Sequence, residues 1–175
     1  MTDRSSQVRS VYIWVTEGTW RASVDAALNL VPPGAQFTLL HVTPAAVTDA
    51  ARGAYLGLFG RGGHDPGARV AQLAAASAAD LLAGAADRLG SRCERIEIQG
   101  QAERAVVRAA ADADLLVMAR DGDQSRLGPK SLGRTARFIL DHAACPVLLV
   151  WPESAPGVGT LPPPPHQPSP PDRST

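Results

Sequence analysis

Two short segments of the sequence carry residue types that suit the binding of a phosphate or another small anion. Residues 16–19 read Thr-Glu-Gly-Thr and follow an apolar run. Residues 119–135 form a longer segment that is punctuated by glycines and carries the cations Arg126, Lys130 and Arg134 beyond Arg120. Glycine lets a backbone approach a ligand closely, and the N–H groups at a helix N-terminus, with cations beside them, bind phosphate well. The alternative, a surface loop with solvated cations and glycines that serve turns, stays open at this point.

No constellation in the sequence predicts a catalytic metal site or an activated nucleophile. The histidines are scattered, and His41 is expected to pack within a strand. The two cysteines, Cys93 and Cys145, lie far apart and form no Cys-x-x-Cys pair. A general base or a metal-binding carboxylate beside the longer glycine-punctuated segment would have to be Asp121 or Asp123. The sequence therefore favours a binding protein over an enzyme and leaves slow hydrolysis of a phosphate-containing ligand as a rival.

Five apolar or β-branched runs predict the strands that position these segments. The strands are expected at residues 11–15, 37–42, 95–98, 115–118 and 147–151. The fourth run, Leu-Leu-Val-Met, is apolar on both faces, which is typical of a central strand in a parallel sheet. The third run is more polar and is expected nearer an edge of the sheet.

Four segments with apolar residues at helical spacing separate these strands. The helices are expected at residues 20–31, 65–90, 102–112 and 132–142. This alternation of strands and helices predicts an α/β fold, in which helices cover both faces of one parallel sheet. In such sheets ligands bind outside the carboxyl ends of the strands, where the strand order reverses. The two glycine-containing segments follow the first and fourth strands, so we expect both of them at that end of the sheet.

Composition predicts one folded domain, residues 1–151, followed by a disordered proline-rich tail, residues 152–175. The tail holds nine of the 15 prolines and few apolar residues, so it cannot bury enough surface to offset the entropy of ordering. Its Pro-x-x-Pro spacings suit an aromatic-lined groove on a partner, and a solvated tail without a partner is the alternative. A glycine-rich stretch, residues 53–67, is expected to form a mobile loop that lies over the crevice as a lid or at an interface.

Positive and negative charges balance, with 17 Lys and Arg against 17 Asp and Glu. No net field therefore recruits nucleic acid or an anionic membrane. No part of the sequence approaches the roughly 18 unbroken apolar residues of a membrane span. Residues 1–10 are polar and lack the apolar core of a signal peptide. We expect a cytoplasmic protein that has neither nucleic-acid nor membrane partners.

Several segments together resemble the universal stress protein family in its UspA-like form. Residues 115–122, Leu-Leu-Val-Met-Ala-Arg-Asp-Gly, precede a basic loop, then Gly-Arg-Thr at 133–135 and His-Ala-Ala-Cys-Pro-Val-Leu-Leu-Val at 142–150. The C-terminal half of the family has a strand, Gly-x-x-Gly, a nine-residue spacer, Gly-Ser or Gly-Thr, a helix and a Cys-Pro-Val-Leu-Val strand. Upstream, Trp-Val-Thr-Glu-Gly-Thr at 14–19 is similar to the family's exit from the first strand, and Leu-Leu-His-Val at 39–42 to its second strand.

The resemblance covers residues 8–151 and implies an adenine nucleotide alpha hydrolase-like fold with strand order 3-2-1-4-5. The first and fourth strands would then be neighbours, and the two glycine-containing segments would flank one crevice. In ATP-binding members of the family, residues matching Glu17 and Val42 hold the adenine and ribose. The positions that match the phosphate-binding elements are Ala119, Gly122, Gly133 and Arg134. The full set of nucleotide-binding residues that we expect is Val15, Thr16, Glu17, Gly18, Thr19, Val42, Met118, Ala119, Arg120, Gly122, Lys130, Gly133, Arg134 and Thr135.

The sequence departs from the family's pattern at four points in this set. Ala119 replaces the first glycine, and its Cβ restricts the approach of a phosphate. Ten residues, instead of nine, separate Gly122 from Gly133. Arg134 stands where the family has a small hydroxyl, and its guanidinium could either pair with a phosphate or fill the crevice. Glu17 replaces an aspartate and is longer by one methylene.

The residues and the resemblance together predict a small stress-response regulatory protein that binds ATP or AMP, with Mg²⁺ in the case of ATP, or a related anion. One rival is a protein-interaction module with a collapsed crevice, in which Arg134 packs within its own domain. The other rival is a slow ATPase. The family covers its apolar fifth strand by pairing it with the same strand of a second subunit, so the resemblance implies a homodimer through residues 147–151.

Overall fold

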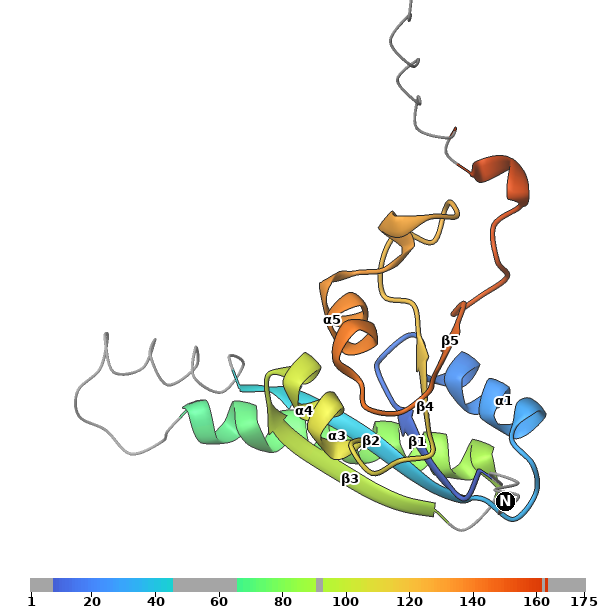
Figure 1. Cartoon of the computed structure of the whole chain (residues 1–175). Coiled ribbons are helices and arrows are strands. Elements are labelled where there is room, and N and C mark those ends of the chain that lie inside the picture. The colour runs from blue at the N-terminus through green and yellow to red at the C-terminus, as the bar shows by residue number, and fades with distance from the viewer. Residues whose placement is uncertain (1–7, 46–65, 91–92, 162, 164–175) are drawn as a thin grey trace, which may run out of the picture.

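Five strands form one all-parallel sheet, and helices cover both of its faces (Figure 1). The computed structural model describes residues 8–45, 66–90, 93–161 and 163. The strands are β1 (Ser10–Trp14), β2 (Gln36–Pro44), β3 (Cys93–Gly100), β4 (Leu115–Ala119) and β5 (Val147–Val150). The helices of the described part are α1 (Trp20–Leu30), α3 (Pro66–Leu89), α4 (Ala102–Ala109) and α5 (Arg134–His142), with two 3-10 turns, η1 (Pro129–Ser131) and η2 (Val158–Thr160).

The strands lie in the order β3-β2-β1-β4-β5, which confirms the expected topology. β1 pairs with β2 on one side and with β4 on the other, so that Ile13 lies opposite both Leu39 and Val117. The chain adds β2 and β3 on one side of β1 and then returns to add β4 and β5 on the other. The carboxyl ends of β1 and β4 are therefore neighbours at the point where the strand order reverses.

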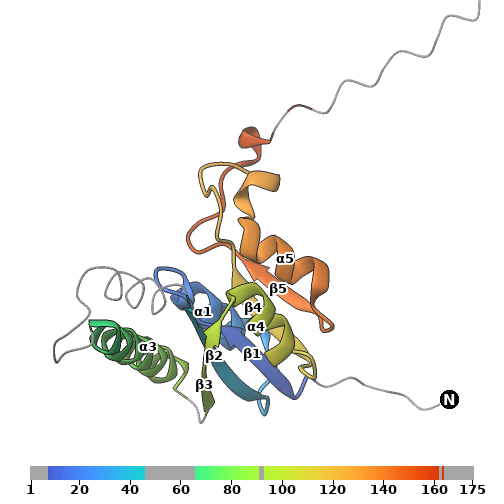
Figure 2. The same cartoon turned by 90° about the vertical axis from the view of Figure 1, so that its left-hand side faces the viewer.

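Two buried clusters lie on opposite faces of the sheet, and Figure 2 shows the helices that cover them. The cluster under α1 and α3 includes Val11, Ile13, Val15, Val24, Leu39, Leu82, Leu89 and Val117. The cluster under α4 and α5 includes Trp14, Leu40, Val42, Val106, Leu116, Met118, Ala136 and Ile139. Successive residues of one strand point to opposite faces, so a strand that is buried on both sides reads as a continuous apolar run. This is the pattern from which the parallel sheet was predicted.

Each covering helix buries one stripe of residues three or four positions apart. In α1 the stripe is Trp20, Val24 and Ala27, and the latter two are fully buried. In α5 it is Ala136 and Ile139, both also fully buried. This spacing follows the helical repeat of 3.6 residues, so the helix axes lie along the sheet with their polar faces outward.

The two edge strands of the sheet differ in polarity. β3 places exposed Glu94, Arg95 and Glu97 along one edge, and charged side chains on an edge strand discourage pairing with another chain. β5 forms the opposite edge and consists of Val-Leu-Leu-Val, with all four residues half-buried. The second edge therefore presents apolar side chains without a charged residue among them.

Two segments extend beyond the carboxyl end of the sheet in Figure 1: the connection from β4 to α5 and the chain after β5. Residues 152–161 are the first part of the predicted tail, and in the structure they include η2. Residues 162 and 164–175 lie outside the described residues. Residues 53–65 of the predicted lid also lie outside the described residues, and its last two residues, 66 and 67, begin α3. Among the described helices, none combines the length and the apolar character needed to cross a membrane.

Candidate functional site

The exit of β1 is a tight turn that leads directly into α1. Val15 is fully buried, and its N–H donates to a carbonyl oxygen of β2 at 2.8 Å. The N–H groups of Thr19 and Trp20 donate to the carbonyl oxygen of Thr16, at 3.3 and 3.1 Å, and the two threonine hydroxyls hydrogen-bond each other. Gly18 has a φ of +79°, in the left-handed region that favours glycine. The glycine at this predicted site position is therefore required by the turn itself.

Glu17 is exposed at this turn and lines a pocket of about 420 Å³ between the carboxyl ends of β1 and β2 and helix α3. His41 and Thr43 of β2 and Asp80 of α3 line the same pocket. Nδ1 of His41 lies 2.9 Å from the carbonyl oxygen of Val15. A carbonyl oxygen only accepts hydrogen bonds, so Nδ1 carries the proton and Nε2 is left to interact with a ligand. The β-strand pattern around His41 predicts only a packed side chain and gives no signal for this position at a pocket.

Val42 and Met118 have their side chains on the other face of the sheet. Val42 is 6% exposed and Met118 is fully buried, and both belong to the cluster under α4 and α5. Ala119, which ends β4, is 5% exposed. These residues form a closed floor at the ends of β2 and β4.

Arg120 follows β4 and contacts both β5 and Trp151, the residue after β5. The backbone N–H of Arg120 donates to the carbonyl oxygen of Val150 at 2.9 Å. Its guanidinium carbon lies 4.5 Å from the centroid of the Trp151 ring, within the range of a cation–π interaction. Its Nη1 donates to the hydroxyl of Ser131. The charge of Arg120 is thus engaged within the chain.

The two ends of the loop after Arg120 pair with each other. The N–H of Gly122 donates to the carbonyl oxygen of Ser131 at 3.1 Å, and the N–H of Asp123 to that of Lys130 at 2.8 Å. A Cβ on Gly122 would overlap the backbone of both partner residues. Ser131 is fully buried, and its hydroxyl donates to the carbonyl oxygen of Gly128 at 2.7 Å. Glycine at 122 is therefore needed for the approach of the chain to itself, and Lys130 has an exposed side chain beyond the stem.

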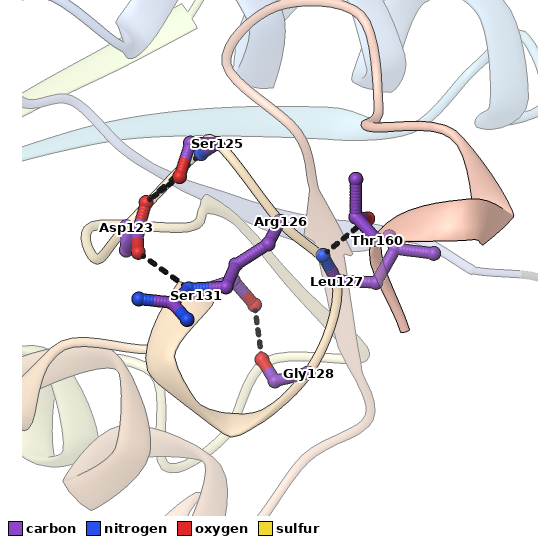
Figure 3. A network of polar contacts seen from close by, with 7 residues as sticks. All are labelled: Asp123, Ser125, Arg126, Leu127, Gly128, Ser131 and Thr160. Atoms are coloured by element: carbon purple, nitrogen blue, oxygen red, sulfur yellow. Dashed lines mark hydrogen bonds and ion pairs between the residues drawn. The ribbon is translucent and has the colours of Figure 1, made fainter. Parts of the chain in front are cut away.

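Hydrogen bonds hold the tip of this loop to itself and to the chain after β5, as Figure 3 shows. The carboxylate of Asp123 accepts from the hydroxyl of Ser125 at 2.6 Å, from its N–H at 3.0 Å, and from Nε of Arg126 at 3.0 Å. These bonds, led by that of the Ser125 hydroxyl, lower the pKa of Asp123 from 3.8 to about 2. The N–H of Leu127 donates to Oγ1 of Thr160 at 3.0 Å. The loop and the segment that contains η2 are thereby joined.

A carboxylate of the same loop lies at the N-terminus of α5. Oδ1 of Asp121 accepts a hydrogen bond from the N–H of Gly133 at 2.7 Å, and Oδ2 accepts one from the N–H of Ala136 at 3.2 Å. A Cβ on Gly133 would lie 2.7 Å from Oδ1 and 2.9 Å from Oδ2. The sequence gives no signal for these contacts, because the partners lie 12 and 15 residues apart and meet only when the loop is closed.

Arg134 and Thr135 begin α5 on the side that faces α4. Together with Glu103 and Phe138 they line a pocket of about 280 Å³ between these two helices. Arg134 is exposed, and the collapsed crevice would require it to be packed within the domain. The structure thus brings Arg120, Gly122 and Gly133 together around Asp121. Glu17 lines a different pocket from Arg134 and Thr135.

The described residues offer no metal centre: none of their His, Cys, Asp and Glu side chains form a group of three that could hold a metal ion. The two carboxylates that could have served a phosphate-bound metal, Asp121 and Asp123, accept hydrogen bonds from the chain itself. Both carboxylates therefore have partners within the chain.

Comparison with known proteins gives one family match. The model of the universal stress protein family matches residues 17–150, which is more than half of the chain. No curated protein matches the sequence significantly.

Several solved structures have the same fold, including the following three. The hypothetical protein MJ0577 has a TM-score of 0.61 and 16% identity, over 85% of this chain and 99% of its own. A universal stress protein in complex with cAMP has a TM-score of 0.57 and 17% identity, over 84% and 99% of the two chains. UspA from Lactobacillus plantarum has a TM-score of 0.57 and 18% identity, over 82% and 98%. At these identities the likeness shows a common fold.

Proposed function

Because the chain belongs to the universal stress protein family, we propose that it is a cytoplasmic regulatory protein of the stress response that binds an adenine nucleotide or a related anion. The ligand would lie where β1 and β4 leave the sheet. The observation that carries this proposal is the adjacency of those two strand ends at the point where the strand order reverses. A universal stress protein of the same fold in complex with cAMP supports a nucleotide as the ligand.

The pocket beside Glu17 fits the nucleoside part of such a ligand. Its volume of about 420 Å³ lies within the usual range for small-molecule sites. Glu17 would accept hydrogen bonds from the ribose hydroxyls, as the family pattern implies. His41 would present Nε2 to the polar edge of the base, with its ring held in place by the carbonyl oxygen of Val15. Binding would then order the pocket and alter the surface that a partner contacts.

The phosphate end of the expected site fits less well. Gly122 and Gly133, which the family uses around the phosphates, here make room for the chain's own backbone and for Asp121. Arg120 is paired with Trp151 and Ser131. We therefore assign no role to a Mg²⁺ ion or to hydrolysis, and the adenosine part of the ligand is the part that the residues support.

A protein-interaction module is the second candidate function, and the closed loop between β4 and α5 favours it. If the crevice binds no ligand, the surfaces of this loop and of the segment after β5 would be the parts that contact a protein partner. The exposed side chain of Arg134 argues against the fully collapsed form of this alternative. The two candidates differ in whether the purified protein retains or binds any adenine compound.

Mass spectrometry of the released ligand tests the proposal. The full chain is purified gently and denatured, and the small molecules in the supernatant are identified. We expect an adenine nucleotide or nucleoside in an amount comparable to that of the protein. A protein that releases nothing, and that also gives no heat with adenosine, AMP or ATP in calorimetry, would favour the interaction module.

We also propose that β5 forms the interface of a homodimer. β5 is an apolar edge strand, and its four residues are half-buried in the single chain. An exposed apolar edge is a template for pairing with another strand, and a second copy of β5 would cover it. The charged edge at β3 lacks this property.

A further inference from the structure

The carboxylate at the N-terminus of α5 has the chemistry of a bound anion. Asp121 presents two oxygens to two backbone N–H groups, those of Gly133 and Ala136, at 2.7 and 3.2 Å. Both groups belong to the start of the helix, where N–H groups lack intrahelical partners and the helix dipole favours negative charge. A phosphate that bound there would use the same N–H groups.

The absence of a side chain at Gly133 leaves space for this carboxylate. The backbone at Gly133 has φ −70° and ψ 179°, an extended conformation that any residue adopts. Backbone strain therefore does not require glycine at this position. A Cβ at this position would lie 2.7 Å from Oδ1 of Asp121, so a side chain at 133 would require the carboxylate to move away from the helix N-terminus. The glycine thus makes room for a carboxylate of the same chain.

The residues on either side of Asp121 fix its position. The N–H of Arg120 is bonded to Val150, and the N–H of Gly122 is bonded to Ser131, at 2.9 and 3.1 Å. The backbone around Asp121 is therefore anchored to β5 on one side and to the stem of the loop on the other. From this anchored position the side chain of Asp121 reaches the first N–H groups of α5.

We propose that Asp121 determines the ligand class of this protein by occupying the position that the β- and γ-phosphates of a nucleotide would need. The proposal rests on the proposed nucleotide site and deepens it. A polyphosphate would have to displace the carboxylate from both N–H groups and would then lie against its negative charge. In the part of the chain that the structure describes, no Lys or Arg forms an ion pair with Asp121 that could offset this repulsion. The crevice accordingly takes a nucleoside or a nucleotide with a single phosphate, and it excludes di- and triphosphates.

Calorimetry with matched ligands and variants tests the proposal. The full chain is titrated with adenosine, AMP, ATP and inorganic tripolyphosphate, as wild type and as Asp121→Ala. Glu153→Gln is the control, because it removes one negative charge from an exposed side chain of the segment after β5 and leaves the bonds of Asp123 in place. Asp121→Asn keeps the size of the side chain and covers the case in which Asp121→Ala fails to fold. The amide resonances of Gly133 and Ala136 report whether the added phosphate reaches the helix.

We expect wild type to bind ATP no more tightly than AMP. Asp121→Ala should bind ATP and tripolyphosphate about tenfold more tightly than wild type does, with adenosine unchanged, since a capping interaction and a repulsive charge are both removed. Asp121→Asn should show a smaller gain in the same direction, and the control should show none. The amides of Gly133 and Ala136 should shift with tripolyphosphate only when Asp121 is replaced.

Two results would overturn the proposal: wild type that binds ATP tenfold more tightly than AMP, or Asp121 variants that gain nothing for either polyphosphate. If neither wild type nor variant binds any adenine compound, the proposed nucleotide function fails. The tripolyphosphate titration still decides the role of Asp121 in that case, because a gain in the variants supports it and the absence of a gain contradicts it.

Discussion

At the start of α5, one side chain has the position in which the family pattern leads us to expect a ligand phosphate. Asp121 accepts hydrogen bonds from two backbone N–H groups there. Gly122 and Gly133 permit close approach, as the sequence indicates, but each of them approaches an atom of the same chain. A glycine motif therefore reports that something comes close to the backbone, and the structure is needed to say what it is.

Asp123, two residues further along the loop, gives a pH dependence. The bonds from Ser125 and Arg126 lower its pKa to about 2, against an ordinary value of 3.8. Because the pKa of Asp123 is lower in the folded state, its hydrogen bonds contribute their full stabilisation of the loop above about pH 4. This stabilisation is lost as the pH falls through about 2. We expect the carboxyl carbon resonance of Asp123 to titrate near pH 2 and to move toward 3.8 in Ser125→Ala. A midpoint near 4 in the wild type would contradict the geometry of the loop tip.

The sequence predicted those features of the site that depend on the local spacing of residues. The spacing of glycines and cations between 119 and 135 located the loop. It could not reveal the contacts of Asp121, because the partners Gly133 and Ala136 belong to the next helix and meet the carboxylate only after Gly122 has closed the stem. The position of His41 at a pocket was not predicted for a related reason. A strand residue at the carboxyl end of a sheet can pack in the core or line a pocket, and the local sequence pattern is the same in both cases.

At the scale of elements, all five strands and the four helices of the described part agree with the sequence prediction. The apolar runs at β1 and β4 are unambiguous because central strands that are covered on both faces have no regular polar alternation. The helix α5 begins at Arg134, two residues after the predicted start. The turn η2 was not predicted, since its hydrogen bond to Leu127 joins residues 33 positions apart.

The segment after β5 is expected to stabilise the loop between β4 and α5. Thr160→Val removes the hydroxyl that accepts from the N–H of Leu127 and donates to the carbonyl oxygen of Gly157. Loss of one such bond should raise the hydrogen-exchange rate of the Leu127 amide by about tenfold. Ser154→Ala, a change at an exposed residue of the same segment, is the matched control. Equal exchange of the Leu127 amide in the two variants would mean that the segment does not hold the loop.

At the scale of the whole molecule, the two edges of the sheet are not equivalent. β3 carries exposed charges, and β5 carries only apolar side chains. Strand order could be assigned from the sequence only through the family resemblance, because apolar runs reveal which segments are strands but not which strands are neighbours. Pairing of the apolar edge requires a second chain, so it has to be tested by measuring the oligomeric state in solution.

The edge difference predicts how a charge on each edge strand will affect assembly. Wild type is expected to sediment as a dimer at micromolar concentration. Val150→Lys places a cation on β5 and should weaken the dimer at least about tenfold, since burying an unpaired charge in an interface is costly. Gln99→Lys adds the same charge to the exposed edge at β3 and should leave the dimer intact. A wild type that sediments as a monomer would exclude the β5 interface.

The most direct test of the nucleotide site is calorimetric titration of AMP into wild type and Glu17→Ala, with Glu94→Ala as a control. Glu17 lines the pocket at the exit of β1, whereas Glu94 is exposed near the opposite end of the sheet on β3. We predict measurable binding to wild type and to the control, and binding about tenfold weaker or more to Glu17→Ala, because a charged acceptor of ribose hydrogen bonds is lost. Absence of binding to wild type at millimolar AMP, or equal affinity in all three proteins, would contradict a nucleotide site at the end of β1.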